Sequence, residues 1–249
     1  MSHWSLSILL YCYYSLLVVL SLYGLHRLAI MWLYITNSNK APSSKTIKTH
    51  PKVTVQLPIF NEENVAARII DAACRLSWPN DQLEIQILDD STDNTRQVID
   101  ERVAYWIKKG CLISIIRRPS RVGFKAGALA NGLKSATGEF ITIFDADFIP
   151  PSSFLDETMP YFISENTGMV QARWGHYNQN ENLLTRLSST LLDGHFVLEH
   201  TARHRSGRFF NFNGTAGIWR LTCILDAGGW QHDTITEDLD ISYRAQLRG

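Results

Sequence analysis

An almost unbroken run of apolar and aromatic residues fills positions 5–35, and it limits the possible folds of the chain more than any other feature. Residues 9–25 carry no charged side chain, and His26-Arg27 interrupts the run before residues 28–35. A bilayer core of about 30 Å is crossed by roughly 20 apolar helical residues, so the run is long enough for a transmembrane helix. A secretory signal peptide or a buried core helix would also explain such a run.

The flanks of the run favour a retained transmembrane helix. A signal peptide has a basic start and a cleavage site of small residues. The first four residues contain no Lys or Arg, and no A-x-A-like site follows the run. The basic residues near it come late in the run or after it: Arg27, Lys40, Lys45, Lys48 and Lys52. By the positive-inside tendency, we expect the rest of the chain on the cytoplasmic side of an inner, plasma or Golgi-type membrane.

The charge balance argues against one class of partner. The 249 residues include 24 Lys and Arg and 24 Asp and Glu, so the chain as a whole creates no basic field that would favour nucleic acid. The four cysteines, Cys12, Cys74, Cys111 and Cys223, have neither metal-ligand nor redox spacing and receive no role.

Residues 1–35 are therefore expected to form a membrane anchor, residues 36–51 a juxtamembrane linker and residues 52–249 a folded domain. In this domain, short apolar runs rich in β-branched residues alternate with stretches of helical spacing. The expected strands are residues 53–57, 84–88, 112–116 and 140–144, and the expected helices are residues 62–76, 93–108 and 125–136. This alternation predicts an α/β fold with a mostly parallel sheet and helices on both faces.

Polar segments follow three of these strands directly. They are Pro58-Ile-Phe-Asn-Glu62, Asp89-Asp90 and Asp145-Ala-Asp147. In open α/β sheets, ligands bind beyond the carboxyl ends of the strands. The three segments are therefore expected to meet at one edge of the sheet and to form a site.

The two carboxylates of Asp145-Ala-Asp147 are two residues apart, so in extended backbone they point the same way. Such a pair can hold Mg²⁺ or Mn²⁺ with other positions left open for diphosphate oxygens and water. A sugar nucleotide needs a cation because its leaving diphosphate gains negative charge. An isolated D-x-D is more often a solvated surface pair, but its position after an apolar strand favours the functional interpretation.

Two further segments have both a structural and a functional explanation. Asp89-Asp90 can accept hydrogen bonds from a base or a ribose, or it can belong to a helix cap in which Asp93 takes part. Lys125, in a glycine-containing segment that opens a helix, can meet phosphate or can be a surface lysine. Arg117, Arg118 and Arg121 add positive charge just upstream.

In the C-terminal part, Thr236-Glu237-Asp238 begins a predicted helix that ends near Leu247. Thr236 can cap this helix, and a carboxylate at its start can instead deprotonate an acceptor hydroxyl. Residues 208–220, rich in Phe, Asn and Gly, predict a tight turn packed by aromatic rings near a ligand. His200 and His204 fit one face of an interfacial or core helix better than a zinc site.

In their order along residues 50–249, these segments resemble family-2 glycosyltransferases with the GT-A fold. The similarity is greatest to membrane-embedded β-glycan synthases of the cellulose-synthase-like group, which includes plant glucomannan mannosyltransferases. The matching segments are LPIFNE at 57–62, LDDSTD at 88–93, GFKAGAL at 123–129, FDADF at 144–148, QARW at 171–174, NFNGTAG at 211–217 and TED at 236–238.

The resemblance implies a Rossmann-like sheet, a UDP-glucose-type or GDP-mannose-type donor, and a glycan or lipid acceptor. It assigns the nucleotide sugar to Pro58, Glu62, Asp89, Asp90, Lys125 and Asp145, the Mg²⁺ or Mn²⁺ to Asp145 and Asp147, and the acceptor to Gln171, Trp174, Asn213, Gly214 and Thr215. Asp238, with Glu237 beside it, would be the catalytic base of a single inverting displacement.

Synthases of this group usually carry Q-x-x-R-W beyond the base, followed by further membrane helices. This sequence ends at Gln246-Leu-Arg-Gly249 without that motif, which predicts a C-terminally truncated domain. A single-transfer enzyme with a lipid acceptor and a non-catalytic fragment are the alternatives.

Overall fold

The computed structural model describes residues 3–40, 42–47 and 49–249. Ala41 and Lys48, two residues of the predicted linker, lie outside the described residues. The chain divides into two compact units, one made of Met1–Ala41 and Trp174–Phe210 and the other of Pro42–Arg173 and Asn211–Gly249.

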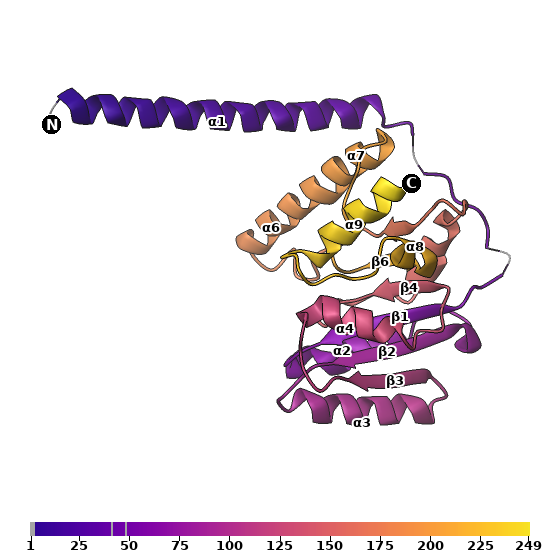
Figure 1. Ribbon diagram of the computed structural model, residues 1–249. Helices are drawn as coiled ribbons and strands as arrows, with labels where there is room; N and C mark the ends of the chain where they lie inside the picture. The colour runs from indigo at the N-terminus through magenta and orange to yellow at the C-terminus, as the bar shows by residue number, and fades with distance from the viewer. Residues whose placement is uncertain (1–2, 41, 48) are drawn as a thin grey trace. The chain divides into compact units, whose positions relative to one another are not determined.

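The larger unit is built on a six-stranded sheet in the order β3-β2-β1-β4-β6-β5 (Figure 1). Strands β1 to β4 run parallel, and β6 is antiparallel to both of its neighbours. The strands are β1 (Val53–Ile59), β2 (Leu83–Asp89), β3 (Leu112–Arg117), β4 (Phe140–Ile143), β5 (Met169–Gln171) and β6 (Gly217–Arg220). The predicted α/β fold with a mostly parallel sheet is confirmed, and the four expected strands are found within two residues of their predicted ends.

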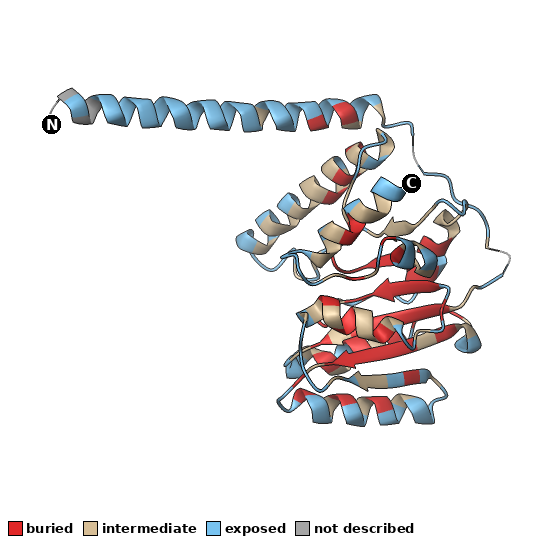
Figure 2. Ribbon diagram, in the orientation of Figure 1, coloured by how far each residue is buried: buried red, intermediate tan, exposed pale blue. Residues whose placement is uncertain are grey.

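Burial explains why helices cover both faces of this sheet. The ribbon of β1 is coloured as buried over most of its length (Figure 2). Val53, Val55 and Leu57 alternate with Thr54 and Gln56 along the strand, so fully buried side chains lie on both faces. Strands buried on both faces need a layer on each side. The helices of this unit are α2 (Glu63–Cys74), η1 (Asn80–Gln82), α3 (Thr95–Lys108), α4 (Phe124–Leu133), α5 (Phe154–Thr158), η2 (Met159–Tyr161), α8 (Leu221–Asp226) and α9 (Glu237–Arg248).

Helix α4 packs against the face of the sheet that carries Gln56 and Gln86. A Cβ placed on Gly132 would lie 2.5 Å from Gln56 Nε2, so only glycine allows this close approach. The helix ends three residues earlier than the sequence predicted. The amides of Lys134 and Ser135 donate to carbonyls three residues back, which tightens the chain into a turn.

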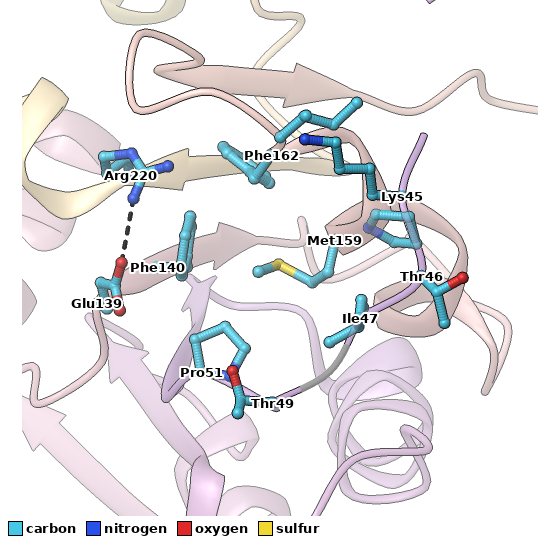
Figure 3. A pocket seen from close by; sticks show the side chains of 12 residues that line it. Lys45, Thr46, Ile47, Thr49, Pro51, Glu139, Phe140, Met159, Phe162 and Arg220 are labelled. Carbon is cyan, nitrogen blue, oxygen red and sulfur yellow. Dashed lines mark hydrogen bonds and ion pairs between the residues drawn. The ribbon is translucent and has the colours of Figure 1, made fainter. Parts of the chain in front are cut away.

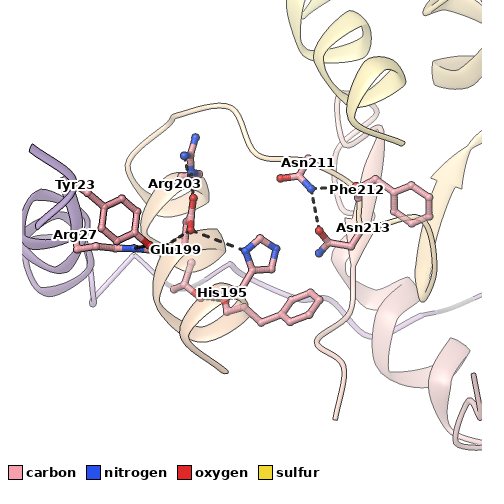
Figure 4. A network of polar contacts seen from close by, with 10 residues as sticks. Tyr23, Arg27, His195, Glu199, Arg203, Asn211, Phe212 and Asn213 are labelled. Atoms are coloured by element: carbon pink, nitrogen blue, oxygen red, sulfur yellow. Dashed lines mark hydrogen bonds and ion pairs between the residues drawn. The ribbon is translucent and has the colours of Figure 1, made fainter. Parts of the chain in front are cut away.

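The smaller unit contains α1 (His3–Thr36), α6 (Leu183–Asp193), the π-helix η3 (Gly194–His200) and α7 (Thr201–Arg205). Ser7–Thr36 of α1 is long and apolar enough to cross a membrane, and most of its aromatic and aliphatic side chains are exposed, whereas Ile30 and Leu33 are buried with Ala202 of α7. Arg27 of α1 donates to Glu199 Oε2 over 3.2 Å, and Arg203 donates to Glu199 Oε1 over 3.0 Å (Figure 4). Glu199 thus joins α1 to the η3–α7 helix within this unit.

Candidate active site

The carboxyl ends of β1 and β4 bring three predicted acidic residues together. Glu62 is the N-cap residue of α2, just after β1, while Asp145 and Asp147 follow β4. Burial raises the pKa of Glu62, and the charges of Asp147 and Asp145 raise it further. Burial also raises the pKa of Asp145, which Lys125 lowers and Asp147 and Asp238 raise. These mutual effects mean that Glu62, Asp145, Asp147 and Asp238 share one electrostatic site.

Lys125 supplies the positive charge at this site. It lies in the first turn of α4, and its ammonium group forms an ion pair with Asp145 Oδ1. The same nitrogen donates to the carbonyl of Gly214 over 3.0 Å. Lys125 therefore lies between the end of β4 and a turn from the C-terminal part of the chain, where its ammonium group can meet an anion.

Asp89 and Asp90 at the end of β2 are both paired with arginines. Asp89 is fully buried and accepts from Arg117 Nε over 2.7 Å and from the amide of Ser91 over 2.9 Å. Arg118 binds both oxygens of Asp90, with 2.9 Å between its Nε and Asp90 Oδ1. Parallel pairing explains the first contact, since Arg117 is the register partner of Asp89. From the sequence alone, these arginines are recognisable only as nearby positive charge.

Arg118 also shapes the loop before α4. Its Nη1 donates to the carbonyl of Val122 over 2.8 Å, and its Nη2 donates to the carbonyl of Phe124 over 3.0 Å. Asp90 thus holds, through Arg118, the segment that leads into Lys125. Asp93 caps the start of α3 as predicted, because its Oδ1 accepts from the amide of Thr95 over 3.0 Å, whereas the side chain of Asn94 makes no capping hydrogen bond.

The predicted turn near residues 208–220 is found at residues 211–216, here called the asparagine–glycine turn. Gln171 Oε1 accepts from the amide of Asn213 over 3.0 Å, and Gln171 Nε2 donates to the carbonyl of Thr215 over 3.0 Å. Asn211 Nδ2 donates to Asn213 Oδ1 over 2.8 Å (Figure 4). Thr215 Oγ1 accepts from the amide of Asp145 over 2.9 Å, which ties the turn to the end of β4.

The backbone of this site contains uncommon conformations. Among the described residues, the non-glycine residues with positive φ are Asn61 at 54°, Phe124 at 47° and Ala216 at 53°. They lie after β1, at the start of α4 and in the asparagine–glycine turn. Such conformations cost about 1–3 kcal/mol each and cluster at functional sites. All three border the segments that hold the acidic residues and Lys125.

Asp238 reaches the site from the first turn of α9. A Cβ added to Gly214, whose φ is +77°, would lie 3.3 Å from both Asp238 Oδ2 and Lys125 Nζ. Asp238 Oδ1 accepts from the amide of Leu239 over 2.8 Å. Thr236 is the N-cap residue of α9 as expected, but its side chain makes no capping hydrogen bond, so the predicted hydroxyl cap is wrong. Glu237, the first residue of α9, is partly buried.

The two residues expected along the acceptor path lie in different units. Gln171 belongs to the sheet unit, where its amide is used by the asparagine–glycine turn. Trp174 belongs to the smaller unit, where its ring lies 5.2 Å from that of Phe196. Pro58, the other predicted donor residue, is the sixth residue of β1 and is partly buried.

The acidic residues fit a hard divalent cation. Mg²⁺ and Mn²⁺ prefer oxygen ligands, which the carboxylates of Asp145 and Asp147 supply. Burial is the main cause of the raised pKa of Asp145, with smaller contributions from the charges of Asp147 and Asp238, and a bound cation would favour its charged form. Within the described part of the chain, no three His, Cys, Asp or Glu side chains come close enough together to hold a metal by themselves.

A cavity of about 330 Å³ lies away from these carboxylates, at the opposite edge of the sheet (Figure 3). Phe140, the first residue of β4, and Arg220, the last of β6, line it with residues of the segment 45–51. Arg220 donates to Glu139 Oε1 over 3.0 Å inside it. The cavity is therefore separate from the acidic site.

The fold is that of GT-A glycosyltransferases. The chain matches the structure of a mannosyltransferase from Pyrobaculum calidifontis, solved in complex with GDP-Man and Mn²⁺, with a TM-score of 0.68 at 20% identity, over 90% of this chain and 61% of that one. It matches S. aureus TarS with a TM-score of 0.55 at 17% identity, over 79% of this chain and 33% of that one. At these identities the likeness concerns the fold alone.

Sequence comparison establishes the family. Residues 54–221 match Glycosyl transferase family 2, and the chain belongs to this family. It is 48% identical over 204 residues to glucomannan 4-beta-mannosyltransferase 2 of Arabidopsis thaliana and 44% identical over 207 residues to glucomannan 4-beta-mannosyltransferase 1 of Cyamopsis tetragonoloba. These matches cover 80% and 81% of this chain but 38% and 39% of the relatives. The predicted family is confirmed, and the chain is related to mannosyltransferases of which it spans about two fifths of the length.

Proposed function

We propose that this chain transfers a hexose, with GDP-mannose as the leading donor and UDP-glucose as the alternative, to the end of a growing β-glycan. The observation that carries the proposal is the ion pair of Asp145 with Lys125 at the carboxyl edge of the sheet, where Glu62, Asp147 and Asp238 are close enough to act on one another or on Asp145 through charge. The mannan-making relatives favour mannose over glucose. The chain spans about two fifths of the length of these relatives, so their polymer-forming activity is a proposal for this chain.

In the proposed mechanism, Asp145 and Asp147 would hold Mg²⁺ or Mn²⁺, which would supply positive charge to the donor diphosphate. Lys125 meets the same diphosphate from the start of α4, while Pro58, Glu62 and the Asp90–Arg118 pair border the nucleoside. Asp89 supports this border through Arg117, because its buried oxygens already accept hydrogen bonds.

The asparagine–glycine turn, with Asn213, Gly214 and Thr215, would border the acceptor, and so would Gln171. Asp238 would take the proton of the acceptor hydroxyl as its oxygen attacks the anomeric carbon. The bond from that carbon to the diphosphate breaks in the same step, so an α-linked donor gives a β-linked product. Glu237 would support the base from the neighbouring position.

We further propose that residues 1–35 anchor the chain in a membrane and that residues 52–249 form a cytoplasmic transferase domain. Residues 36–51 would link the anchor to this domain. The support is the exposed apolar surface of α1 and the placement of basic residues late in or after the apolar run.

The test uses membranes that carry the chain, supplied with radiolabelled GDP-mannose or UDP-glucose and Mn²⁺. We expect polymer-bound label from GDP-mannose that an endo-β-mannanase releases. Label in a chloroform-soluble product would support the lipid-acceptor alternative. Tight binding of Mn²⁺–GDP without any transfer would identify a donor-binding fragment, and the absence of both would contradict the proposal.

A further inference from the structure

One buried hydroxyl joins the helix of the proposed base to the asparagine–glycine turn. Ser242 lies one helical turn after Asp238 in α9 and is only 1% exposed. Its Oγ donates to the carbonyl of Asp238 over 2.5 Å and accepts from the amide of Phe212 over 2.8 Å. The hydroxyl of Ser242 thus donates its proton within α9, and its oxygen accepts the hydrogen bond that holds the turn.

The two ends of this connection carry the groups that must meet during transfer. Phe212 is fully buried against Trp219, with ring centroids 5.8 Å apart, and leads directly into Asn213 and Gly214. Asp238 stands beside Gly214, whose missing Cβ would lie 3.3 Å from its carboxylate. A shift of α9 along the turn would change the position of Asp238 relative to the end of β4.

We propose that Ser242 is a positioning residue that sets the place of the base Asp238 against the asparagine–glycine turn. This inference rests on the proposed function and deepens it. The turn has other attachments, through Gln171 to its middle and through Thr215 to Asp145. Loss of the Ser242 contact should therefore leave the turn folded and tied to the donor side, while its tie to α9 loosens.

The chemistry of the site requires a hydroxyl at this position. Alanine would leave the buried amide of Phe212 without its acceptor, and an unpaired buried donor costs about 1–3 kcal/mol. The least costly response is a small movement of the turn or of α9 that lets water in. A displacement of about 1 Å at a reacting group can lower the rate by as much as 10²-fold, so a partial shift should cost roughly tenfold.

The experiment compares Ser242→Ala, Ser242→Thr and a matched control, Thr54→Val, in the full chain. Thr54 is also fully buried, and its hydroxyl accepts from the amide of Gly138 over 2.9 Å and donates to Glu84 over 2.6 Å. It lies at the amino end of β1, away from the acidic residues. The control therefore reports what losing a buried hydroxyl does to the fold alone.

We expect Ser242→Ala to lower kcat about tenfold while the KM for the donor and the Kd of Mn²⁺–GDP change less than about twofold. Ser242→Thr, which keeps the hydroxyl, should recover most of kcat. Thr54→Val should lower the melting temperature without this split between kcat and KM. Equal losses of kcat in Ser242→Ala and Thr54→Val would overturn the inference.

A second measurement is independent of turnover. Amide hydrogen exchange should become faster at residues 212–216 in Ser242→Ala and should stay unchanged there in Thr54→Val. Unchanged protection of these amides in Ser242→Ala would overturn the proposed role of Ser242, whatever the effect of the substitution on the rate of transfer. If exchange responds as expected while no donor supports transfer, the proposed function fails and the structural connection stands.

Discussion

The end of β4 and the asparagine–glycine turn are neighbours in the site, yet different interactions hold them. The end of β4 continues a buried parallel pairing with β1, in which Val53 and Phe140 are register partners. The turn is held largely by side chains that bond to backbone, among them Gln171, Thr215 and Ser242. A backbone ladder survives most side-chain substitutions, whereas each of these contacts disappears with one residue.

This difference implies that the two parts of the site have different functions. In the proposed function, the strand ends hold the nucleotide and its metal, so donor binding should depend mainly on the charged groups of Asp145, Asp147 and Lys125. The turn and α9 should govern the transfer step. Substitutions on the two sides should therefore separate into effects on affinity and effects on rate.

The largest expected effect is on the rate. Asp238→Asn should lower kcat by about 10²–10⁴-fold, because a positioned general base contributes this much. The Kd of Mn²⁺–GDP near neutral pH should stay within about twofold of the unsubstituted protein, and isothermal titration calorimetry with a transfer assay would measure both. Asp233→Asn, an exposed position five residues earlier, is the matched control. Retained turnover in Asp238→Asn would rule out Asp238 as the base.

The next effect is on donor affinity. Asp147→Ala should weaken Mn²⁺-dependent binding of GDP by about 10–100-fold, the equivalent of one charged contact worth 1.5–3 kcal/mol. Binding measured in EDTA should be the same for both proteins, since Asp147 acts through the metal. Unchanged Mn²⁺-dependent binding would remove Asp147 from the metal site.

Substitution of Lys125 should change the affinity for the metal and the affinity for the metal–nucleotide complex in opposite directions. Its ion pair with Asp145 competes with a cation, while its charge favours the diphosphate. Lys125→Met should therefore bind Mn²⁺ alone more tightly and Mn²⁺–GDP more weakly, each by about tenfold. The free Mn²⁺ signal in electron paramagnetic resonance measures the first and calorimetry the second. Lys134→Met, at the exposed end of α4, should change neither; changes in the same direction for both ligands would contradict the placement of Lys125.

The strand ends were predictable from the sequence because their signals are local. An apolar run such as residues 140–144 predicts both a strand and its carboxyl end, and the parallel topology brings such ends together. The hydrogen bond from the amide of Asn213 to Gln171 Oε1 joins residues 42 positions apart and leaves no pattern in either segment. The pairing of Asp90 with Arg118 likewise depends on the β2–β3 register, which composition does not reveal.

Helix α6 is a different case, because local residues in the sequence do indicate where it begins, although no helix was predicted there. Asn182 and Thr185 form a reciprocal capping box, and leucines at 183, 184, 187 and 191 follow helical spacing. By contrast, Thr236 carries a capping signal that its side chain does not use. A capping residue therefore indicates where a helix begins more reliably than it indicates which hydrogen bond forms.

The smallest expected effect links the two sides through charge. Asp238 raises the pKa of Asp145, after the larger effect of burial, so Asp145 takes up a proton at a higher pH than an ordinary aspartate. A metal needs the unprotonated carboxylate, and Mn²⁺–GDP binding should therefore weaken as the pH falls through this raised pKa. In Asp238→Asn, the pKa of Asp145 should drop and the weakening should begin at a lower pH.

The mildly acidic side of this profile is where the two proteins should differ. There Asp238→Asn should bind Mn²⁺–GDP roughly 1.4- to fivefold more tightly than the unsubstituted protein, as expected for a charge interaction of 0.2–1 kcal/mol. The difference should shrink in 1 M salt, where charges are screened within about 3 Å. Asp233→Asn should leave the profile unchanged. A midpoint that stays in place or rises in Asp238→Asn would mean that Asp238 does not act on Asp145 through charge, and the two sides of the site would then be electrostatically independent.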